Sequence, residues 1–398
     1  TGQNIAVDFG GYNVKQTLEP YMSLGYELFT YNNGVNNKIT TITDNFTYYL
    51  GSHKLTAGLS FEHQMANNSY MRNGTGYYRY RSLNDFLTGA APEAVALTYG
   101  YAGNLNPAAE VSFNQYGLYL QDEWNVLDNL KLTGGIRFDN ISYDDDDIMR
   151  NNAIYELDFG GRHIDTGKWA KSNIQISPRF GFTWDVFKDR TLKVRGGSGI
   201  FTGRLPLVFF TNMPTNGGMV QYQAQINAAN AAKRGFDMDT FAGGLVTDAN
   251  GKATQKALYD KLISLGYPST IKPEDGTVPS AIAAVSENFK LPQVWKASVA
   301  IDYQVPVSFP FTLSGEFIYN KTLNETTISD WSIPSVGGFA RYNGVDNRPI
   351  YPTGFRTNTK AFVLENTSRG YGWTANLTAN VQPSEWVSLM AAYTHNVA

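Results

Sequence analysis

Residues 113–139, FNQYGLYLQDEWNVLDNLKLTGGIRFD, alternate apolar and polar side chains along two consecutive segments. A period of two residues is the mark of a β-strand whose faces meet different environments. The alternation breaks at 127–129 and then resumes, which predicts an antiparallel hairpin. In its first strand the apolar side holds Tyr116, Leu118, Leu120, Trp124 and Val126, and the polar side holds Gln115, Gln121, Glu123 and Asn125.

The same design recurs in four further stretches, at 40–64, 179–201, 293–321 and 371–395. Each contains two alternating runs around a short turn, so the five stretches predict ten strands. Within the first 35 residues Ile5, Val7 and Phe9 also alternate, which adds one or two strands. We therefore expect about 10 to 12 strands.

The connections between the predicted strands are of two kinds. Turns within a hairpin are short, whereas the gaps between hairpins run over 65–112, 144–175, 203–291 and 324–369. Short turns at one edge and long loops at the other are typical of transmembrane β-barrels, whose long loops are extracellular. Loops of this length are uncommon in compact soluble domains.

Aromatic residues lie at the ends of the apolar strand faces. Tyr116 and Trp124 are eight residues apart, as are Trp295 and Tyr303. Eight residues in a strand tilted by about 40° rise about 21 Å, close to the apolar band of a membrane barrel. The predicted aromatic girdle consists of Tyr116, Trp124, Trp184, Trp295, Trp373 and Trp386.

The alternative is a soluble β-sandwich, but its strands are usually shorter and its inner faces rich in Val, Ile and Leu. We therefore predict an all-β fold, a transmembrane antiparallel β-barrel with long extracellular loops, in which 1–398 is a single domain segment. The polar strand faces should line the lumen. These residues include Gln121, Glu123, Lys131, Arg137, Arg179 and Arg195.

Composition agrees with this fold class and removes other classes. The 398 residues carry a net charge of −3, which argues against a nucleic-acid partner. No run of 18 apolar residues occurs, so a helical membrane protein is excluded. Cysteine is absent, which removes disulfide frameworks and thiolate metal sites.

Catalytic and metal-binding patterns are weak. The four histidines, at 53, 63, 163 and 395, lack the spacing of a zinc site. The run 196–199, GGSG, lacks the order of a nucleophile elbow, and Gly251-Lys252 is followed by Ala253 where a P-loop needs Ser or Thr. We predict no enzyme activity, no metal and no cofactor.

The loop segment 70–81 is the main candidate for ligand contact, because it mixes aromatic and guanidinium groups. Tyrosine rings stack on sugars or peptide side chains, and arginine binds carboxylates in a bidentate manner. The alternative is that these side chains pack the loop against the barrel rim. The candidates are Tyr70, Tyr77, Tyr78, Arg79, Tyr80 and Arg81.

Two other loop features stand out. Asp144, Asp145, Asp146 and Asp147 follow a strand end and could bind a divalent cation, but the Asp/Gly spacing of a defined calcium loop is missing, which favours a solvated acidic loop. The stretches QAQINAANAAKRG and KATQKALYDKLISLG, within 221–265, have helix-compatible composition. Substrate gating and simple loop folding are both open for them.

Three stretches resemble the barrel of TonB-dependent outer-membrane transporters, specifically the SusC/Oar-like branch. They are YGLYLQDEWNVLDNLKLTGGIRFD at 116–139, ISPRFGFTWDVFKDRTLKVRGGSGIFTGRLPLVFFTN at 176–212, and SHKLTAGLSFEHQ at 52–64. The resemblance covers the chain from about residue 36 onward. It implies a 22-stranded barrel closed by an N-terminal plug domain. No plug-like pattern precedes residue 36, so we expect this chain to be part of such a barrel.

The resemblance implies uptake of a scarce solute (a glycan, peptide or chelate), energised through TonB by a region missing from this chain. It also implies outer-membrane lipid and lipopolysaccharide as surroundings and, in some members, a surface lipoprotein that covers the pore. Two alternatives stay open: a passive porin, and a surface adhesin or assembly protein.

Overall fold

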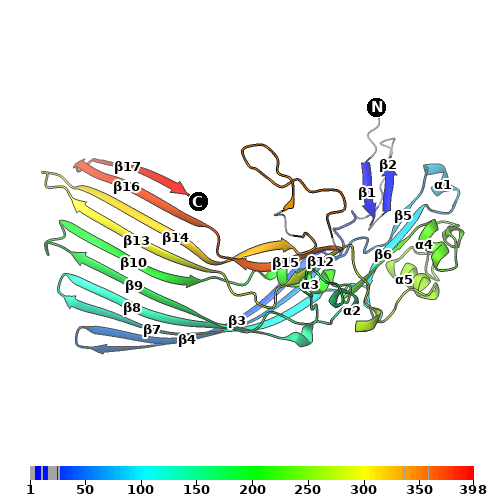
Figure 1. Ribbon diagram of the computed structural model, residues 1–398, viewed down its shortest axis with the longest axis horizontal. Helices are drawn as coiled ribbons and strands as arrows, with labels where there is room; N and C mark the ends of the chain where they lie inside the picture. Colours follow the sequence, from blue (N-terminus) through cyan, green and yellow to red (C-terminus); the bar gives the residue numbers. More distant parts are fainter. Residues whose placement is uncertain (1–4, 10–11, 17–24, 26, 335–337, 357) are drawn as a thin grey trace.

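The computed structural model describes residues 5–9, 12–16, 25, 27–334, 338–356 and 358–398. Ten strands form one curved wall in which each strand pairs antiparallel with the next (Figure 1). The order follows the chain, and the ten strands are those of the five predicted hairpins. They are β3 (Gly34–Leu50), β4 (His53–Ser69), β7 (Ala109–Leu127), β8 (Leu130–Tyr143), β9 (Ile174–Asp185), β10 (Leu192–Thr202), β13 (Gln293–Gln304), β14 (Phe311–Asp330), β16 (Tyr371–Ser384) and β17 (Val387–Val397).

The register of the wall places apolar residues beside apolar residues, and polar residues beside polar residues, on neighbouring strands. Leu118 of β7 lies opposite Leu59 of β4 and Phe138 of β8, and Glu123 lies opposite Lys54 and Thr133. Because side chains alternate along each strand, this register separates an apolar face from a polar face across the sheet. The predicted alternation is thus confirmed as a property of the whole wall.

The apolar face of the wall is exposed. Leu118 is 60% exposed, and Ile42, Phe180, Ile301, Leu377 and Leu389 are likewise open on other wall strands. An apolar band of this extent is rare on proteins that face water and common on those that face lipid. No helix in the described ranges is long and apolar enough to span a membrane.

The first residues form strands, as predicted, but outside the wall. β1 (Ile5–Phe9) and β2 (Tyr12–Gln16) pair only with each other within the described part of the chain. Among the described residues the wall therefore has ten strands, which is within the predicted 10 to 12.

The predicted asymmetry of the connections is confirmed. Two-residue turns follow β3 and β7, and the long connections lie together at the opposite end, where they carry further elements (Figure 1). We call this end the cap. Its elements are β5 (Tyr77–Arg79), α1 (Leu83–Leu87), β6 (Ala94–Gly100), η1 (Asp145–Asp147), α2 (Asn152–Tyr155), α3 (Leu207–Asn216), β11 (Gln221–Ile226), α4 (Ala228–Lys233), η2 (Met238–Phe241), α5 (Gln255–Ser264), η3 (Pro273–Asp275), β12 (Ala281–Val285) and β15 (Lys360–Thr367).

The cap joins loops that are distant in sequence. β6 pairs with β11 and β5, and β12 pairs in parallel with β15, which continues along β14. The helical prediction for 221–265 holds for α4 and α5, but QAQI lies in β11. That segment is a strand because β6 offers it an antiparallel partner, a long-range contact that overrides local composition.

The hydrophobic core of the molecule lies in the cap. One cluster surrounds the β6–β11 sheet and includes Val95, Leu97, Tyr99, Phe241, Leu258 and Leu262. A second, which we call the rim cluster, joins the cap to the wall and includes Phe113, Tyr143, Trp169, Phe210 and Phe289. The apolar face of the wall, by contrast, stays exposed and forms no such core.

Candidate functional site

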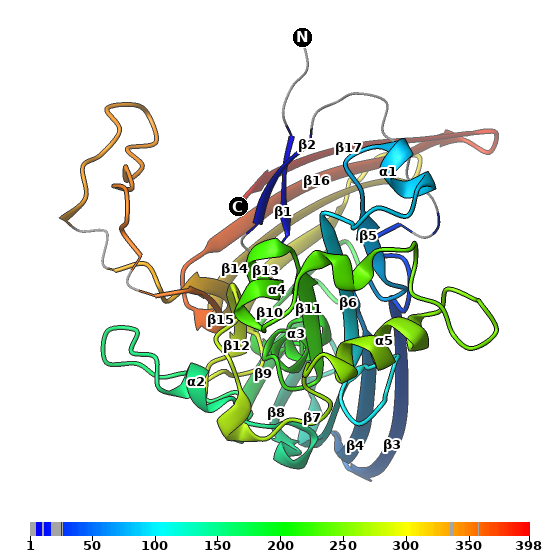
Figure 2. The same cartoon turned by 90° about the vertical axis from the view of Figure 1, so that its right-hand side faces the viewer.

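The polar face of the wall is the concave face. Helix α3 packs on this face, where Phe210 stacks on Tyr143 at 5.4 Å between ring centroids and Asn68 Nδ2 donates to Thr211 Oγ1 at 3.2 Å. Figure 2 shows α3 inside the curve of the strands. The predicted lumen-facing residues share the strand face of Tyr143 and Asn68, so they line the hollow of the wall.

Several of these residues are held by ion pairs between strands. Glu123 lies between Lys54 Nζ at 3.0 Å and Lys131 Nζ at 3.4 Å. Arg195 contacts Asp302 at 3.3 Å. These pairs join neighbouring strands and fix the positions of the charged groups on the polar face.

Among the predicted lumenal residues, Arg137 combines an ion pair, a hydrogen bond and a contact with an aromatic ring. Its guanidinium contacts the Asp139 carboxylate at 2.8 Å, donates to Ser60 Oγ at 3.1 Å and lies over the Tyr119 ring at 5.6 Å. Gly117 leaves room for it, since a Cβ there would lie 2.3 Å from Arg137 Nη2. Arg179 lies over Phe201 at 4.7 Å, and Gln121 stands in register with Thr56 and Gly135.

The six girdle candidates lie on the opposite, apolar face or in its turns. Trp124 stacks on His53 near a short turn, and Trp386 is 91% exposed beside the β16–β17 turn. At the cap end Trp295 meets Tyr319 edge to face, and Trp373 lies near Phe317. Tyr116 of β7 and Trp184 of β9 are also exposed. Their role as a membrane girdle stays a prediction.

The candidate ligand segment 70–81 is largely occupied with contacts inside the cap. Tyr70 stacks on Phe29 at 6.2 Å, and Tyr80 meets Phe86 edge to face. Tyr77 belongs to β5, in register with Ala96.

Tyr78, Arg79 and Arg81 of the same segment also have partners. Tyr78 Oη accepts from the Val246 amide at 3.2 Å, and burial raises the pKa of this phenol to about 12. Arg79, 11% exposed, and Arg81, 78% exposed, both contact Glu93. The structure brings the candidates together, and their contacts favour the packing alternative for all but the exposed Tyr70 and Arg81.

The aspartate run makes contacts to the backbone and to its own loop. Asp144 is the N-cap of η1, where its Oδ1 accepts from the Asp146 amide at 3.1 Å, and Asp145 Oδ1 accepts from the Trp169 amide at 2.8 Å. The side chain of Asp147 lies outside the described residues. Among the described residues no group of three or more His, Asp or Glu side chains is placed to hold a metal ion.

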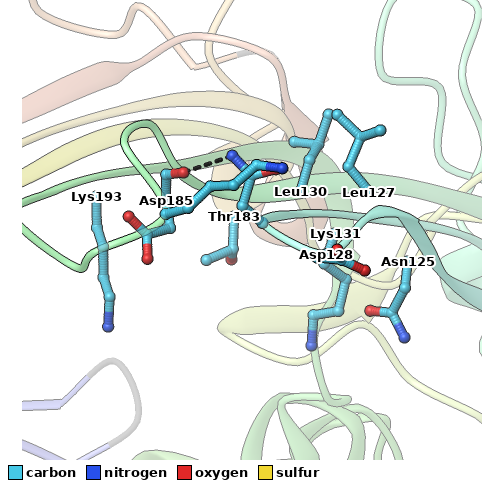
Figure 3. A pocket seen from close by; sticks show the side chains of 10 residues that line it. Asn125, Leu127, Asp128, Leu130, Lys131, Thr183, Asp185 and Lys193 are labelled. Carbon is cyan, nitrogen blue, oxygen red and sulfur yellow. Dashed lines mark hydrogen bonds between the residues drawn. The ribbon is translucent and has the colours of Figure 1, made fainter.

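Two hollows lie near the polar face. The first, about 310 Å³, lies between the β7–β8 and β9–β10 turns, where Lys131, Lys193 and Asn125 extend to one side (Figure 3). It is bounded by charged residues of both signs, and the Arg190 amide is shared between the two carboxylate oxygens of Asp185 at 3.0 and 3.1 Å. Asn129 Nδ2 donates to the Asp185 carbonyl at 2.7 Å, which ties the two turns together.

The second hollow, about 500 Å³, is a groove between α3 and β12 in the cap. Its lining is apolar apart from two asparagines, Asn212 and Asn216 of α3. Sequence reasoning missed it, because asparagines four residues apart in a helix carry no signal until the facing strand is known.

An amphipathic ten-stranded wall, exposed on its apolar face and capped by long loops at one end, defines an outer-membrane β-barrel. The sequence matches the family model described as outer membrane beta barrel domain over residues 4–396, so the chain belongs to this family. Its location is accordingly the bacterial outer membrane. A comparison with curated proteins finds no match.

The solved structures that match this chain share little sequence with it. The outer membrane transporter YddB from Escherichia coli is 12% identical, with 91% of this chain and 33% of that one covered and a TM-score of 0.46. A mutant of the ferric enterobactin receptor PfeA from Pseudomonas aeruginosa is 12% identical, with 91% and 35% covered and a TM-score of 0.45. The FrpB iron transporter from Neisseria meningitidis is 12% identical, with 92% and 37% covered and a TM-score of 0.43. The chain thus spans about a third of the length of these structures.

Proposed function

We propose that the chain supplies wall and cap to a TonB-dependent outer-membrane transporter of the SusC/Oar-like branch, which imports a scarce solute by energised gating. The branch assignment rests on the sequence resemblance at 52–64, 116–139 and 176–212. TonB would act through a segment outside this chain. Outer-membrane lipid and lipopolysaccharide would surround the wall, and a surface lipoprotein is a candidate partner at the cap.

The observation that carries the proposal is the rim cluster. Trp169 and Phe210 stack at 5.3 Å, and Phe210 meets Phe289 at 5.7 Å. These side chains come from two different long loops and pack against Phe113 and Tyr143 on the lumenal face. An aromatic cluster there narrows the lumen at the cap end, which favours binding and gating over free diffusion through an open porin.

Cells that carry the intact gene, cells with the gene deleted and cells lacking TonB would be compared for the solutes they remove from a defined medium. The proposal expects at least one solute whose removal is lost in both mutants. Removal that persists without TonB, together with steady conductance in a planar bilayer, would establish the passive porin. An unchanged solute profile with lost surface attachment would establish the adhesin.

A further inference from the structure

Two cations on the polar face of the wall have no acidic partner. Arg179 of β9 and Lys296 of β13 lie on either side of Gly199 of β10, each in register with it. Both residues are exposed, and within the described part of the chain neither takes part in an ion pair. Each is therefore a positive charge on the lumenal face that no neighbouring side chain neutralises.

The other cations on the polar face of the described wall strands each lie beside an acid. The ion pairs join Lys54 and Lys131 to Glu123, Arg137 to Asp139, and Arg195 to Asp302. Lys193 stands in register between Asp185 and Asp302. The wall thus balances its lumenal cations everywhere except at Arg179 and Lys296.

The neighbours of Arg179 and Lys296 on the same face carry no carboxylate, either across the strands or along them. Besides Gly199 these neighbours are Gly135, Ser177, Gly181, Val294, Ser298 and Asn320. Charges of one sign that are not balanced locally create a potential that attracts ions of the opposite sign. The potential at this place in the lumen therefore favours an anion.

One aromatic ring holds the two cations beside each other. Arg179 Cζ lies 4.7 Å and Lys296 Nζ lies 5.8 Å from the ring centroid of Phe201, which is 37% exposed. A contact with the face of a ring uses the charge of a cation but leaves its N–H donors available. The guanidinium and the ammonium therefore converge on one place with donors open to the lumen.

The floor around Arg179 lacks side chains. Gly135, Gly181, Gly197 and Gly199 occupy adjacent positions on the polar face of β8, β9 and β10. None of the four has a positive φ, so their backbone conformation does not require glycine. A Cβ at Gly199 would lie 3.0 Å from Arg179 Cγ. The glycines leave room for the arginine stem and allow a bound group to approach the sheet closely.

We propose that Arg179 and Lys296 form a lumenal site for one oxyanion group, a carboxylate or a phosphate, of a small acidic solute. The guanidinium donates two parallel hydrogen bonds to the oxyanion, and the ammonium supplies a second charge from across Gly199. The glycine floor admits the group between them. As the substrate class of the transporter, acidic solutes rest on the function proposed above.

Convergence and position select a small solute over an acidic protein segment. An extended segment spreads its side chains at about 3.3 Å per residue and on alternate sides, whereas both cations here contact a single ring. Arg179 lies near the middle of β9 (Ile174–Asp185), so the site is inside the lumen and not at either mouth. A solute that has passed the rim cluster would meet it on its way through.

The first test measures the local charge in the cysteine-free chain. Ser298→Cys places a thiol beside Lys296 on the same face of β13, and the full chain in lipid nanodiscs is reacted with two methanethiosulfonates, the anionic sulfonatoethyl and the cationic trimethylammonioethyl reagent. The ratio of the anionic to the cationic rate should fall at least about tenfold when Arg179→Gln and Lys296→Gln are added. An unchanged ratio would overturn the proposal.

Two controls separate charge from folding. Arg179→Lys combined with Lys296→Arg keeps both charges and should keep the ratio within about twofold. Thr378→Cys, on the polar face of β16 and two strands away from β13, should show a ratio that the two glutamines leave within about twofold, because salt screens charges at that distance. An equal fall at Thr378→Cys would contradict a local site.

The second test measures binding of the oxyanion itself. Glucuronate and glucose 6-phosphate, each at about 10 mM and at constant ionic strength, are added while the neutral reagent methyl methanethiosulfonate reacts with the Ser298→Cys chain. At least one of them should slow the reaction about threefold or more, and the stronger one identifies the preferred group, carboxylate or phosphate. Glucose should leave the rate within about 1.5-fold, and so should both anions when the two glutamines are present.

Equal protection by glucose, no protection by either anion, or protection that survives both glutamines would overturn the proposal. Protection by a tetraglutamate peptide alone would assign the cations to an acidic protein segment and overturn it as well. Because binding is measured on the isolated chain without TonB, its failure is distinguishable from a failure of energised uptake.

Discussion

Asn151 shows how single residues hold the cap together. Its side chain is fully buried, Nδ2 donates to the carbonyls of Gly217 and Thr277 at 2.9 Å each, and Oδ1 accepts from the Ile154 amide at 3.2 Å. One carboxamide thus links two long loops. In the sequence it was indistinguishable from the exposed asparagines around it, because its role depends on partners 66 and 126 residues away.

Asn151→Ala should destabilise the cap by roughly 1–3 kcal/mol, because the buried Gly217 carbonyl and the part-buried Thr277 carbonyl both lose their carboxamide donor. Hydrogen exchange of the amides in 144–173 and 217–277 measures the change. Asn250→Ala, at an exposed position, is the matched control and should leave exchange unchanged. Equal exchange in the two variants would contradict the linking role.

Asp330 closes the base of the 331–360 loop. Its carboxylate accepts from Ser332 N at 3.1 Å, from Ser332 Oγ at 2.6 Å and from Ala361 N at 3.1 Å, and it pairs with Arg356. Asp330→Asn should weaken this base by about 1.5–3 kcal/mol, since charged hydrogen bonds are lost. Faster exchange of the Trp331 amide, which donates to Ala361 O at 2.8 Å, would report it. Asp346→Asn, in an exposed pair with Arg348, should have no such effect.

The same carboxylate gives the loop base a pH dependence. Asp330 lies at the cap end of β14, beyond the membrane-spanning part. Burial raises its pKa, but the bonds from Arg356, Ser332 and Ala361 outweigh burial and hold the pKa below the ordinary value of 3.8. A lowered pKa stabilises the folded base above pH 3.8, and this stabilisation is lost as pH falls below that value. The protection factor of the Trp331 amide, which corrects for the slower intrinsic amide exchange in acid, should therefore fall in acid in the natural chain and fall less in Asp330→Asn. Parallel acid profiles would contradict the assignment.

At the scale of elements, a strand could be predicted from the sequence when local interactions determine it, and could not when its partner is distant in the chain. The wall strands could be predicted because one face meets lipid and the other meets water. Each strand therefore alternates apolar and polar residues within its own sequence. β6 could not be predicted, since Ala94–Gly100 is buried on both sides and shows no period of two. Its place depends on β11, more than a hundred residues away in sequence.

The pairing of β6 with β11 can be tested by a disulfide in the cysteine-free chain. Thr98 and Gln223 are register partners, so cysteines at both positions stand within the usual separation for a disulfide. We expect the double variant Thr98→Cys, Gln223→Cys to oxidise nearly completely, as measured by free-thiol titration. Thr98→Cys combined with Asn250→Cys should keep both thiols. Two free thiols in the first variant would show that these loops do not pair.

At the scale of the whole molecule, the wall and the cap bury apolar side chains in different media. The wall leaves its apolar face open, whereas the cap builds two clusters of its own. The tryptophans divide in the same way, because Trp169 and Trp331 belong to the cap while Trp124, Trp184, Trp295, Trp373 and Trp386 lie on the wall or its turns.

This division predicts how lipids quench tryptophan fluorescence. In a variant that keeps only Trp184 or only Trp295, with Phe at the other six positions, lipids brominated near the headgroup should quench more strongly than lipids brominated near the chain end. An interfacial girdle requires this order, because indole rings settle at headgroup depth. A variant that keeps only Trp169 should be quenched by neither lipid. Equal quenching of Trp169 and Trp184 would contradict the separation of cap and membrane, and stronger quenching of Trp184 by the deep bromines would place it inside the apolar band instead of at its edge.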